Sequence, residues 1–333
     1  MPEGCYKALR TRTRPDPFMK LVSIPANPVP YGVDTGTFRT GDGVSLRYAR
    51  WAPPAGRKGT VCLFQGRAEF IEKYYETAAD LRARGFAVAT LDWRGQGLSD
   101  RPLPDPLKGH VGNFSEYDID LQTFMQEVVL PDCPPPIFAV GHSMGGAILI
   151  RSARQGHRWF DRIVLSAPMI ALRGARSMGA ARVIIGAGRL LGMGASYAPG
   201  GDRMPVNARP FFGNVLTSDP VRYARNAAVL EAEPALGVAA PTFSWADAAF
   251  KVMNDFSQHA YAANIRQPIL LIGAGHDAVV STQAIESFAI RLRAGSHLIV
   301  PGAEHEILME HDRYRGQFWA AFDAFVPGTP LFA

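Results

Sequence analysis

The amino-acid sequence predicts an α/β fold in which a mostly parallel central sheet has helices on both faces and carries a helical lid insertion. Three observations predict it: short apolar runs alternate with helix-like segments, one run turns directly into a helix at a Gly-x-Ser-x-Gly sequence, and the alternation stops between Pro168 and Phe250. Buried parallel strands form continuous apolar runs because helices cover both faces of the sheet. The length of 333 residues, with 47% hydrophobic and 20% charged residues, is typical of a soluble globular protein with a large core.

Composition excludes several classes of protein. The net charge of +5 comes from Lys and Arg spread along the chain without a nucleic-acid motif, so we expect no nucleic-acid partner. Cys5, Cys62 and Cys133 match no metal or disulfide spacing and indicate a reducing compartment. No apolar stretch has the length of a signal peptide or a membrane span, so the expected location is the cytoplasm. Peripheral contact with the inner face of the membrane and the oligomeric state stay open.

The chain begins with a proline-rich arm, residues 1–35, whose lack of periodicity favours an extended segment laid over the domain or left mobile. A hairpin of two antiparallel strands is expected over residues 36–51, because β-prone residues flank the turn signal Gly41-Asp42-Gly43. Six further strands are expected in apolar runs at 60–64, 86–91, 137–140, 163–165, 269–272 and 297–300.

Helices are predicted between these strands. Apolar residues at three- and four-residue spacing over 70–84 end at Gly85, a helix stop signal. A second helix is expected from about Asn113 to Val129, stopped by Pro131. This alternation divides the chain into an α/β core, residues 36–168 and 251–333, and an inserted lid or cap subdomain, residues 169–250.

The lid is expected to sit above the strand ends, where it would decide which substrates enter. Its apolar stretch is interrupted by glycines and accompanied by arginines. It is therefore either an interfacial segment with arginines placed for lipid phosphate or an amphipathic helix packed on the core. The apolar residues are Met178, Val183, Ile184, Ile185, Leu190, Leu191 and Met193, and the arginines are Arg173, Arg176, Arg182 and Arg189.

The run at 137–140 continues into Gly141-His142-Ser143-Met144-Gly145, which matches the G-x-S-x-G turn between a strand and a helix. Such a turn needs glycine at 141 and 145 because side chains there would clash with neighbouring atoms. The turn exposes the hydroxyl of Ser143, the candidate nucleophile, and the backbone N–H of Met144 is a candidate donor to an oxyanion. A glycine-rich turn that only packs is the alternative.

A serine hydroxyl needs a base to take its proton and a carboxylate to orient that base. In sites of this kind the acid and the histidine follow the serine in chain order, each on a loop just after the carboxyl end of a strand. Asp277 follows the run at 269–272, and His305 follows the run at 297–300, before a helix starting near Ile307. Other candidates are weaker in position: His276, His297 and His311 are expected in a turn, a strand and the last helix, and Asp247 and Asp255 precede the relevant strand.

The second oxyanion donor is expected from the loop after the run at 60–64, with the backbone N–H of Arg67 as the best candidate. A plain glycine turn before a helix is the alternative reading of this loop. We expect Gln65, Gly66 and His142 to contact the substrate or to shape its pocket.

Several motifs occur together in the chain: Gln65-Gly66 with Glu69, Asp92 through Ser99, Gly141 to Gly146, Gly275 with Asp277, and Gly302 with His305 and Glu306. They resemble the monoacylglycerol lipase and lysophospholipase branch of the α/β-hydrolases, over about residues 36–326. One departure is that many members have His where this chain has Gln65, which implies altered pocket polarity with hydrolysis retained. Further segments are similar to bacterial PldB-type lysophospholipases: Asn214 to Asp219, Arg222-Tyr223, Asn226, Gly237 to Thr242, Trp245, and His305-Glu306-Ile307-Leu308.

The resemblance implies an α/β-hydrolase that cleaves a carboxylic ester of a lipid, a lysophospholipid or a monoacylglycerol, with no metal or cofactor. Ser143 would form an acyl-enzyme, His305 would transfer the proton, and Asp277 would hold the imidazole. Two alternatives stay open. An aminopeptidase of the same fold acting on small peptides would need an acidic subsite, for which Glu231, Glu233 and Asp247 are candidates, and a non-catalytic binding or scaffold module would require a broken triad.

Overall fold

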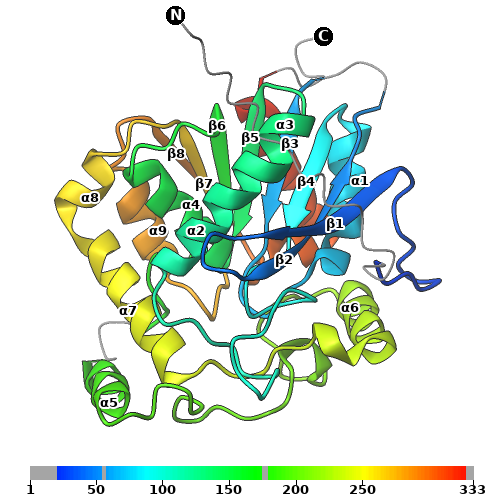
Figure 1. Ribbon diagram of the computed structural model, residues 1–333. Coiled ribbons are helices and arrows are strands. Elements are labelled where there is room, and N and C mark those ends of the chain that lie inside the picture. The colour runs from blue at the N-terminus through cyan, green and yellow to red at the C-terminus, as the bar shows by residue number, and fades with distance from the viewer. Residues whose placement is uncertain (1–20, 55–57, 175–178, 328–333) are drawn as a thin grey trace, which may run out of the picture.

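Strands with apolar side chains on both faces build the centre of this fold, because only a covered position keeps both faces from water. The computed structural model describes residues 21–54, 58–174 and 179–327, and within them it has one sheet of eight strands (Figure 1). In chain order the strands are β1 (Val33–Arg39), β2 (Ser45–Trp51), β3 (Thr60–Phe64), β4 (Ala87–Leu91), β5 (Ile137–His142), β6 (Arg162–Ser166), β7 (Ile269–Ala274) and β8 (Gly295–Val300).

The sheet has the order β1-β2-β4-β3-β5-β6-β7-β8, and all pairs from β4 to β8 are parallel. β1 and β2 form an antiparallel hairpin, and β2 also pairs antiparallel with β4. The hairpin turn includes Gly43 at φ +90°, a left-handed conformation that glycine adopts without strain. The predictions of a mostly parallel sheet and of an antiparallel hairpin are both confirmed.

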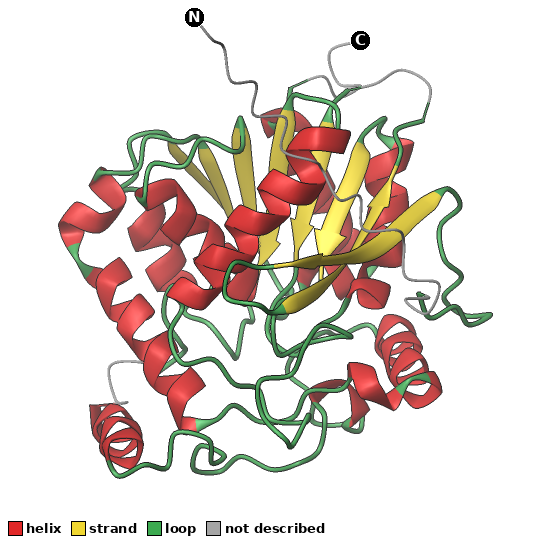
Figure 2. Cartoon of the chain, in the orientation of Figure 1, coloured by secondary structure: helices red, strands yellow, loops and turns green. Residues whose placement is uncertain are grey.

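Helices cover both faces of the sheet, as Figure 2 shows. α2, α4 and α9 pack on one face, and α1 and α10 pack on the other. The α-helices are α1 (Tyr75–Ala83), α2 (Ser115–Phe124), α3 (Leu130–Asp132), α4 (Ser143–Arg154), α5 (Gly179–Leu190), α6 (Pro220–Ala232), α7 (Phe243–Ser257), α8 (His259–Ala263), α9 (Thr282–Ala289) and α10 (Asp312–Phe325). Shorter turns are the 3₁₀ segments η1 (Ile71–Tyr74), η4 (Val206–Ala208), η5 (Pro234–Leu236) and η6 (Ile307–Met309), and the π segment η2 (Met125–Val129).

Alternate residues of the central strands enter two separate cores. In β3, Cys62 and Phe64 join the core under α2, α4 and α9, whereas Val61 and Leu63 join the core under α1 and α10. Fully burying an aliphatic or aromatic side chain stabilises a fold by about 1.5–3 kcal/mol. Because the strands are parallel, their carboxyl ends meet at one edge of the sheet, and the loops after β3, β5, β7 and β8 come together there.

The structure differs from the sequence prediction at the ends of three helices. The helix expected over 70–84 begins with the 3₁₀ turn η1, although it ends as expected before Gly85, whose φ is +95°. The helix expected to stop at Pro131 continues through the π segment η2 and through α3 to Asp132, one residue past the proline. α10 begins at Asp312, so His311 precedes the last helix instead of lying in it, and the expected helix start near Ile307 is the single turn η6.

The segment between β6 and β7 includes the insertion expected at residues 169–250. It contains α5, α6 and part of α7, and it lies along the carboxyl ends of the strands (Figure 1). The expected boundary at residue 250 falls inside α7, whose buried Val252 and Phe256 belong to the core beside the sheet. Of the expected arm, residues 1–20 lie outside the described residues, and Leu21 is buried in the core under α1 and α10.

Candidate active site

β5 passes into α4 through a sharp turn at Ser143. Ser143 has φ +47°, a left-handed conformation that is strained for a residue with a side chain, and it is the first residue of α4. A Cβ atom at Gly141 would lie 2.6 Å from Leu149 Cδ1, and one at Gly145 would lie 2.5 Å from the carbonyl oxygen of Phe64. Close packing therefore requires glycine at both positions, and the turn holds Ser143 at the carboxyl edge of the sheet.

Two loops bring Asp277 and His305 to this serine. His305 Nδ1 lies 2.8 Å from Asp277 Oδ2, and His305 Nε2 lies 3.1 Å from Ser143 Oγ. An ionised carboxylate only accepts hydrogen bonds, so Nδ1 carries the proton and Nε2 is left to accept the proton of the serine hydroxyl. All three residues are buried. Residues from three loops that are distant in the chain thus form one hydrogen-bonded line.

The carboxylate of Asp277 is fixed in both orientation and charge. Its Oδ1 atom accepts the N–H groups of Val279 and Val280, each at 2.8 Å, which leaves Oδ2 for His305. Burial raises the pKa of Asp277. This effect is outweighed by the hydrogen bond and charge of His305 and by the two N–H groups, so the pKa lies below its ordinary value. An ionised carboxylate at this position stabilises a positive charge on the imidazole.

The loop after β3 lies against the serine turn. A Cβ atom at Gly66 would lie 3.2 Å from Ser143 Cβ, so the loop backbone passes directly beside the hydroxyl-bearing residue. The N–H of Gly66 donates to the Glu69 carboxylate at 2.5 Å. The N–H of Arg67 has no acceptor among the described residues, and the N–H of Met144 stands in the first turn of α4, where helix N–H groups lack a partner in the helix.

Gln65, Gly66 and His142, the residues expected to shape the substrate pocket, contact other residues of the protein. The side-chain amide of Gln65 donates to the Thr90 hydroxyl at 2.9 Å, while its Oε1 atom has no hydrogen-bond partner in the described part of the chain. Gly66 has both of its backbone groups in hydrogen bonds. The ring of His142 lies 4.8 Å from the ring of His305, and burial lowers the pKa of His142 to about 4, so that it stays neutral near pH 7.

A buried polar cluster next to the serine was missed by sequence reasoning as a unit. The ammonium group of Lys73 lies 2.9 Å from Glu69 Oε1 and 2.6 Å from Glu306 Oε1, and the Tyr74 hydroxyl donates to Glu69 at 2.8 Å. Burial favours the neutral form of Lys73, but the two carboxylates raise its pKa above the ordinary value. The available signals were the four-residue spacing of Glu69 and Lys73 and the position of Glu306 directly after His305.

Glu69, His142 and Glu306 also place three donor atoms within 4.8 Å of one another, a spacing that metal ligands can have. The cluster already contains a cation, because the Lys73 ammonium contacts both carboxylates. A metal ion would have to displace this buried ammonium group, so we assign no metal to these residues.

Glu310 joins the loop of His305 to the insertion. Its carboxylate accepts the N–H of Glu304 at 2.8 Å, and it accepts the N–H and the hydroxyl of Ser218 at 3.1 and 2.6 Å. The N–H of Glu306 donates to the carbonyl oxygen of Leu216 at 2.7 Å, which adds a backbone contact between the same segments. No local sequence pattern indicates this connection, since 92 positions separate Ser218 from Glu310.

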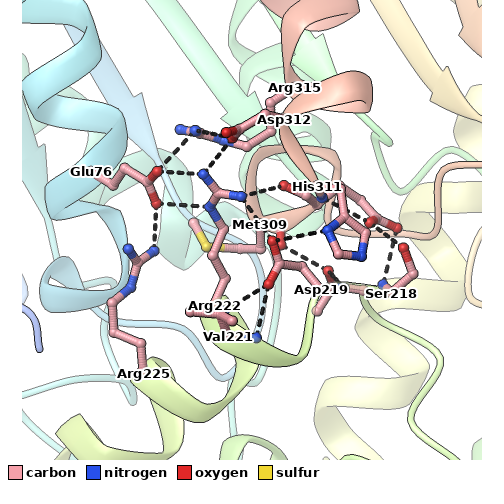
Figure 3. A network of polar contacts seen from close by, with 12 residues as sticks. Glu76, Ser218, Asp219, Val221, Arg222, Arg225, Met309, His311, Asp312 and Arg315 are labelled. Carbon is pink, nitrogen blue, oxygen red and sulfur yellow. Dashed lines mark hydrogen bonds and ion pairs between the residues drawn. The ribbon is translucent and has the colours of Figure 1, made fainter.

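Arginine side chains hold α6 on the core beside this connection (Figure 3). Arg222 of α6 contacts Glu76 of α1 and Asp312 of α10, each at 2.6 Å. Arg225 and Arg315 also contact Glu76, at 2.7 and 2.9 Å. Burial raises the pKa of Glu76, but its hydrogen bonds and the charges of the three arginines lower it to about 2. The insertion is therefore fixed on this side by a network of ion pairs.

α5 carries the apolar stretch that the sequence places in the lid. Ile185 and Gly188 are buried, and a Cβ atom at Gly188 would lie 2.3 Å from Phe243 of α7, so the helix packs closely there. Arg189 forms an ion pair with Asp247 of α7. Met178 and Arg176 lie outside the described residues. The opposite side is apolar and exposed at Val183 (71%), Ile184 (54%), Leu190 (90%) and Leu191 (78%).

Comparison with known proteins places this chain among lipid-ester hydrolases. The sequence model of the family described as Serine aminopeptidase, S33, matches residues 55–312. Lysophospholipase L2 of Escherichia coli (strain K12) is 34% identical over 292 residues, which cover 85% of this chain and 84% of that protein. Monoacylglycerol lipase of Mycolicibacterium smegmatis is 26% identical over 274 residues, which cover 81% of this chain and 89% of that protein.

Solved structures show the same fold. A soluble variant of monoglyceride lipase from Saccharomyces cerevisiae, in complex with a substrate analog, has a TM-score of 0.70 at 19% identity, over 90% of this chain and 97% of that one. The resemblance that the motifs indicate is confirmed by the family match and by the alignment with the E. coli protein over most of both chains. The chain therefore belongs to the Serine aminopeptidase, S33, family, in the lysophospholipase and monoacylglycerol lipase branch of the α/β-hydrolases.

Proposed function

We propose that this protein is a serine hydrolase that cleaves carboxylic esters of lipids, lysophospholipids or monoacylglycerols, through an acyl-enzyme on Ser143. The observation that carries the proposal is the line from Asp277 through His305 to Ser143, with contacts of 2.8 and 3.1 Å. At this distance Nε2 can take the hydroxyl proton while Oγ attacks a carbonyl carbon. The names of the relatives, lysophospholipase and monoacylglycerol lipase, support an ester as substrate.

The proposed reaction has two halves. Oγ of Ser143 bonds to the ester carbonyl carbon, His305 takes the proton, and the carbonyl oxygen gains a negative charge beside the N–H groups of Met144 and Arg67. The bond to the leaving alcohol then breaks, and the imidazolium returns its proton to that alcohol. Water, deprotonated by the same imidazole, attacks the acyl carbon. The bond from that carbon to Ser143 Oγ then breaks, Oγ takes the proton back from the imidazolium, and a fatty acid is released. Asp277 stabilises the imidazolium in both halves.

An aminopeptidase of the same fold would need a carboxylate to bind the free amine of a peptide. Asp247 is paired with Arg189 and Lys251. Glu233 accepts an N–H at the start of η5, and Glu231 is exposed on α6. Since none of these three residues offers a buried and unpaired carboxylate, the described chain favours an ester over a peptide.

A fluorophosphonate probe tests the mechanism, because it reacts with an activated serine. We expect the probe to label the protein and the Ser143→Ala variant to lose both the label and the release of fatty acid. Rates on a lysophospholipid, a monoacylglycerol and an aminoacyl amide then rank the substrates, and we expect both esters to exceed the amide. Full labelling of the Ser143→Ala variant would exclude this serine as the nucleophile.

We further propose that the exposed apolar side of α5 contacts a lipid surface during catalysis. No helix of the described residues has the length and apolarity needed to cross a bilayer. Val183, Ile184, Leu190 and Leu191 expose apolar side chains on one side of this segment, and an exposed apolar side of this kind binds the interface of a bilayer. We expect co-sedimentation with anionic vesicles, reduced in a Leu190→Asp, Leu191→Asp double variant that still hydrolyses a water-soluble ester. Equal sedimentation of the two proteins would refute the contact.

A further inference from the structure

We propose that the guanidinium group of Arg67 binds the phosphate of a lysophospholipid, so that this residue selects lysophospholipids over uncharged monoacylglycerols. This inference rests on the proposed function, because it names the substrate class of the same site. The backbone N–H of Arg67 is the candidate oxyanion donor, whereas the guanidinium would bind the phosphate, so the two roles belong to different groups of the residue.

Arg67 differs from the buried cations elsewhere in the described chain. Arg47, Lys73, Arg94 and Arg315 are the buried basic side chains there, and each contacts at least one carboxylate. Arg67, like Arg101, is half-buried and has no carboxylate within 4.0 Å among the described residues, but its side chain donates to one carbonyl oxygen whereas that of Arg101 donates to four. A partly buried guanidinium without a counter-ion is available to pair with an anionic ligand.

The surroundings of the guanidinium leave part of it available. Nη1 of Arg67 donates to the carbonyl oxygen of Ala239 at 2.8 Å, and the guanidinium carbon lies 5.5 Å from the centre of the Trp245 ring. Nε and Nη2 have no acceptor in the described chain, and neither is sealed from water. Burial, with a smaller contribution from the charge of Arg209, lowers the pKa of Arg67 to about 10, so that the group is still charged near pH 7.

The position of Arg67 matches the shape of a lysophospholipid. Its own N–H is the candidate oxyanion donor, and the preceding Gly66 lies against Ser143. The amide nitrogen and the guanidinium carbon of Arg67 are separated by a certain number of bonds. The ester carbonyl carbon and the phosphorus of a lysophospholipid are separated by the same number. A lipid that has its carbonyl oxygen at the Arg67 N–H and its glycerol alongside the Arg67 side chain would therefore bring its phosphate to the guanidinium.

The chemistry of the two groups is complementary. A phosphodiester keeps one negative charge at neutral pH, and a guanidinium binds its oxygens through parallel N–H groups. A monoacylglycerol presents hydroxyl groups at this distance from its ester, and they cannot neutralise the cation. The side chain of Arg67 thus favours the phosphate-bearing lipid.

The test compares two substrates on two variants. Arg67→Met removes the charge and keeps much of the side-chain volume, and kcat/KM is measured for a lysophosphatidylethanolamine and a monoacylglycerol with the same acyl chain. We expect the ratio of the two values, lysophospholipid over monoacylglycerol, to fall about 10- to 100-fold. The matched control is Arg101→Met, because Arg101 is also half-buried but donates to four carbonyl oxygens, those of Gly95, Gly97, Pro106 and Ala235. Arg101→Met is expected to leave the ratio unchanged.

The outcomes separate this inference from the proposed function. A wild-type protein that hydrolyses neither ester contradicts the proposed function. A wild-type protein that hydrolyses both, with the same ratio in Arg67→Met, contradicts the phosphate contact alone. If Arg67→Met does not fold, the wild-type protein still gives an answer: glycerophosphoethanolamine should inhibit hydrolysis of a neutral ester, whereas glycerol should not. Equal inhibition by the two compounds would overturn the inference.

Discussion

Replacing Glu310 by Gln is expected to slow catalysis, although Glu310 contacts neither Ser143 nor the imidazole of His305. The carboxylate is fully buried, and it accepts four hydrogen bonds. Oε1 accepts the N–H groups of Glu304 and Ser218 at 2.8 and 3.1 Å. Oε2 accepts the Ser218 hydroxyl and the His311 N–H at 2.6 and 3.2 Å. Glu304 directly precedes the candidate base, so the carboxylate holds the backbone that positions it.

The magnitude follows from where a glutamine amide would place its nitrogen. At the position of Oε1, the nitrogen would face two backbone N–H groups and leave both without an acceptor. At the position of Oε2, the Ser218 hydroxyl could turn and accept, so that only the N–H of His311 loses its partner. This second arrangement costs about 2–4 kcal/mol, counting one unsatisfied buried N–H and the weaker bonds of an uncharged acceptor. A displacement of the base by about 1 Å would lower kcat about 100-fold.

Three measurements check the Glu310→Gln variant: kcat on a water-soluble ester, the rate of fluorophosphonate labelling, and urea unfolding. We expect kcat and the labelling rate to fall about 10- to 100-fold at a temperature where the variant is folded. The control is Asp312→Asn on the same segment, because the Asp312 side chain is 84% exposed and surface ion pairs contribute only about 0–1 kcal/mol. A variant with lower stability but wild-type kcat would show that Glu310 supports the fold without positioning His305.

Three further predictions concern the site and the attachment of the insertion. Gly145→Ala should lower kcat at least about 100-fold, since the added Cβ would lie 2.5 Å from the Phe64 carbonyl oxygen and push the neighbouring loop; wild-type labelling kinetics would contradict this. Asp277→Asn should lower kcat about 10⁴-fold with the circular dichroism spectrum unchanged, whereas a loss below about tenfold would refute the role of this acid. The pKa of Glu76 is about 2 in the folded protein, below its ordinary value of 4.5. The ionised Glu76 therefore contributes fully to the free energy of unfolding above about pH 4.5, and this contribution is lost as the pH falls toward 2. Urea unfolding between pH 7 and pH 3 should therefore show a smaller loss of stability on acidification for Glu76→Gln than for wild type, and parallel curves would argue against it.

The parts of the fold that the sequence predicted are those fixed by neighbouring residues. The run 60–64 matches a strand residue for residue, because burial on both faces favours apolar side chains, and its one polar side chain, Thr60, donates to the carbonyl oxygen of Pro134. The G-x-S-x-G turn is local at Gly141, where an added Cβ would meet Leu149 and Gly146, whereas Gly145 is required by the carbonyl oxygens of Phe64, at the end of β3, and Gln65, in the loop after it. Asp277 and His305 were located by topology, since parallel strands end at one edge of the sheet.

What the sequence could not predict depends on contacts between distant segments. The carboxylate of Glu310 meets Ser218 only after the insertion has docked, so no periodicity or motif indicates it. Lys73 has an acidic neighbour at helical spacing, but its second carboxylate, Glu306, comes from 233 positions away. The continuation of the helix past Pro131 depends on the wider turn of η2, and single residue preferences do not predict a π segment.

The two sides of the insertion are attached to different parts of the core: α6 to the side of the His305 loop, and α5 to α7. α6 is held by ion pairs of Arg222 and Arg225 with Glu76, and the same side carries Ser218, whose partner Glu310 supports the His305 loop. Moving α6 would therefore disturb the candidate base. α5 instead packs on α7 at Gly188, is joined to it by the ion pair of Arg189 with Asp247, and exposes an apolar side. A lipid surface would receive the exposed side of α5, and within the described residues α5 makes no hydrogen bond or ion pair with the His305 loop. The vesicle experiment on α5 and the kinetic experiment on Glu310 thus test opposite sides of one arrangement.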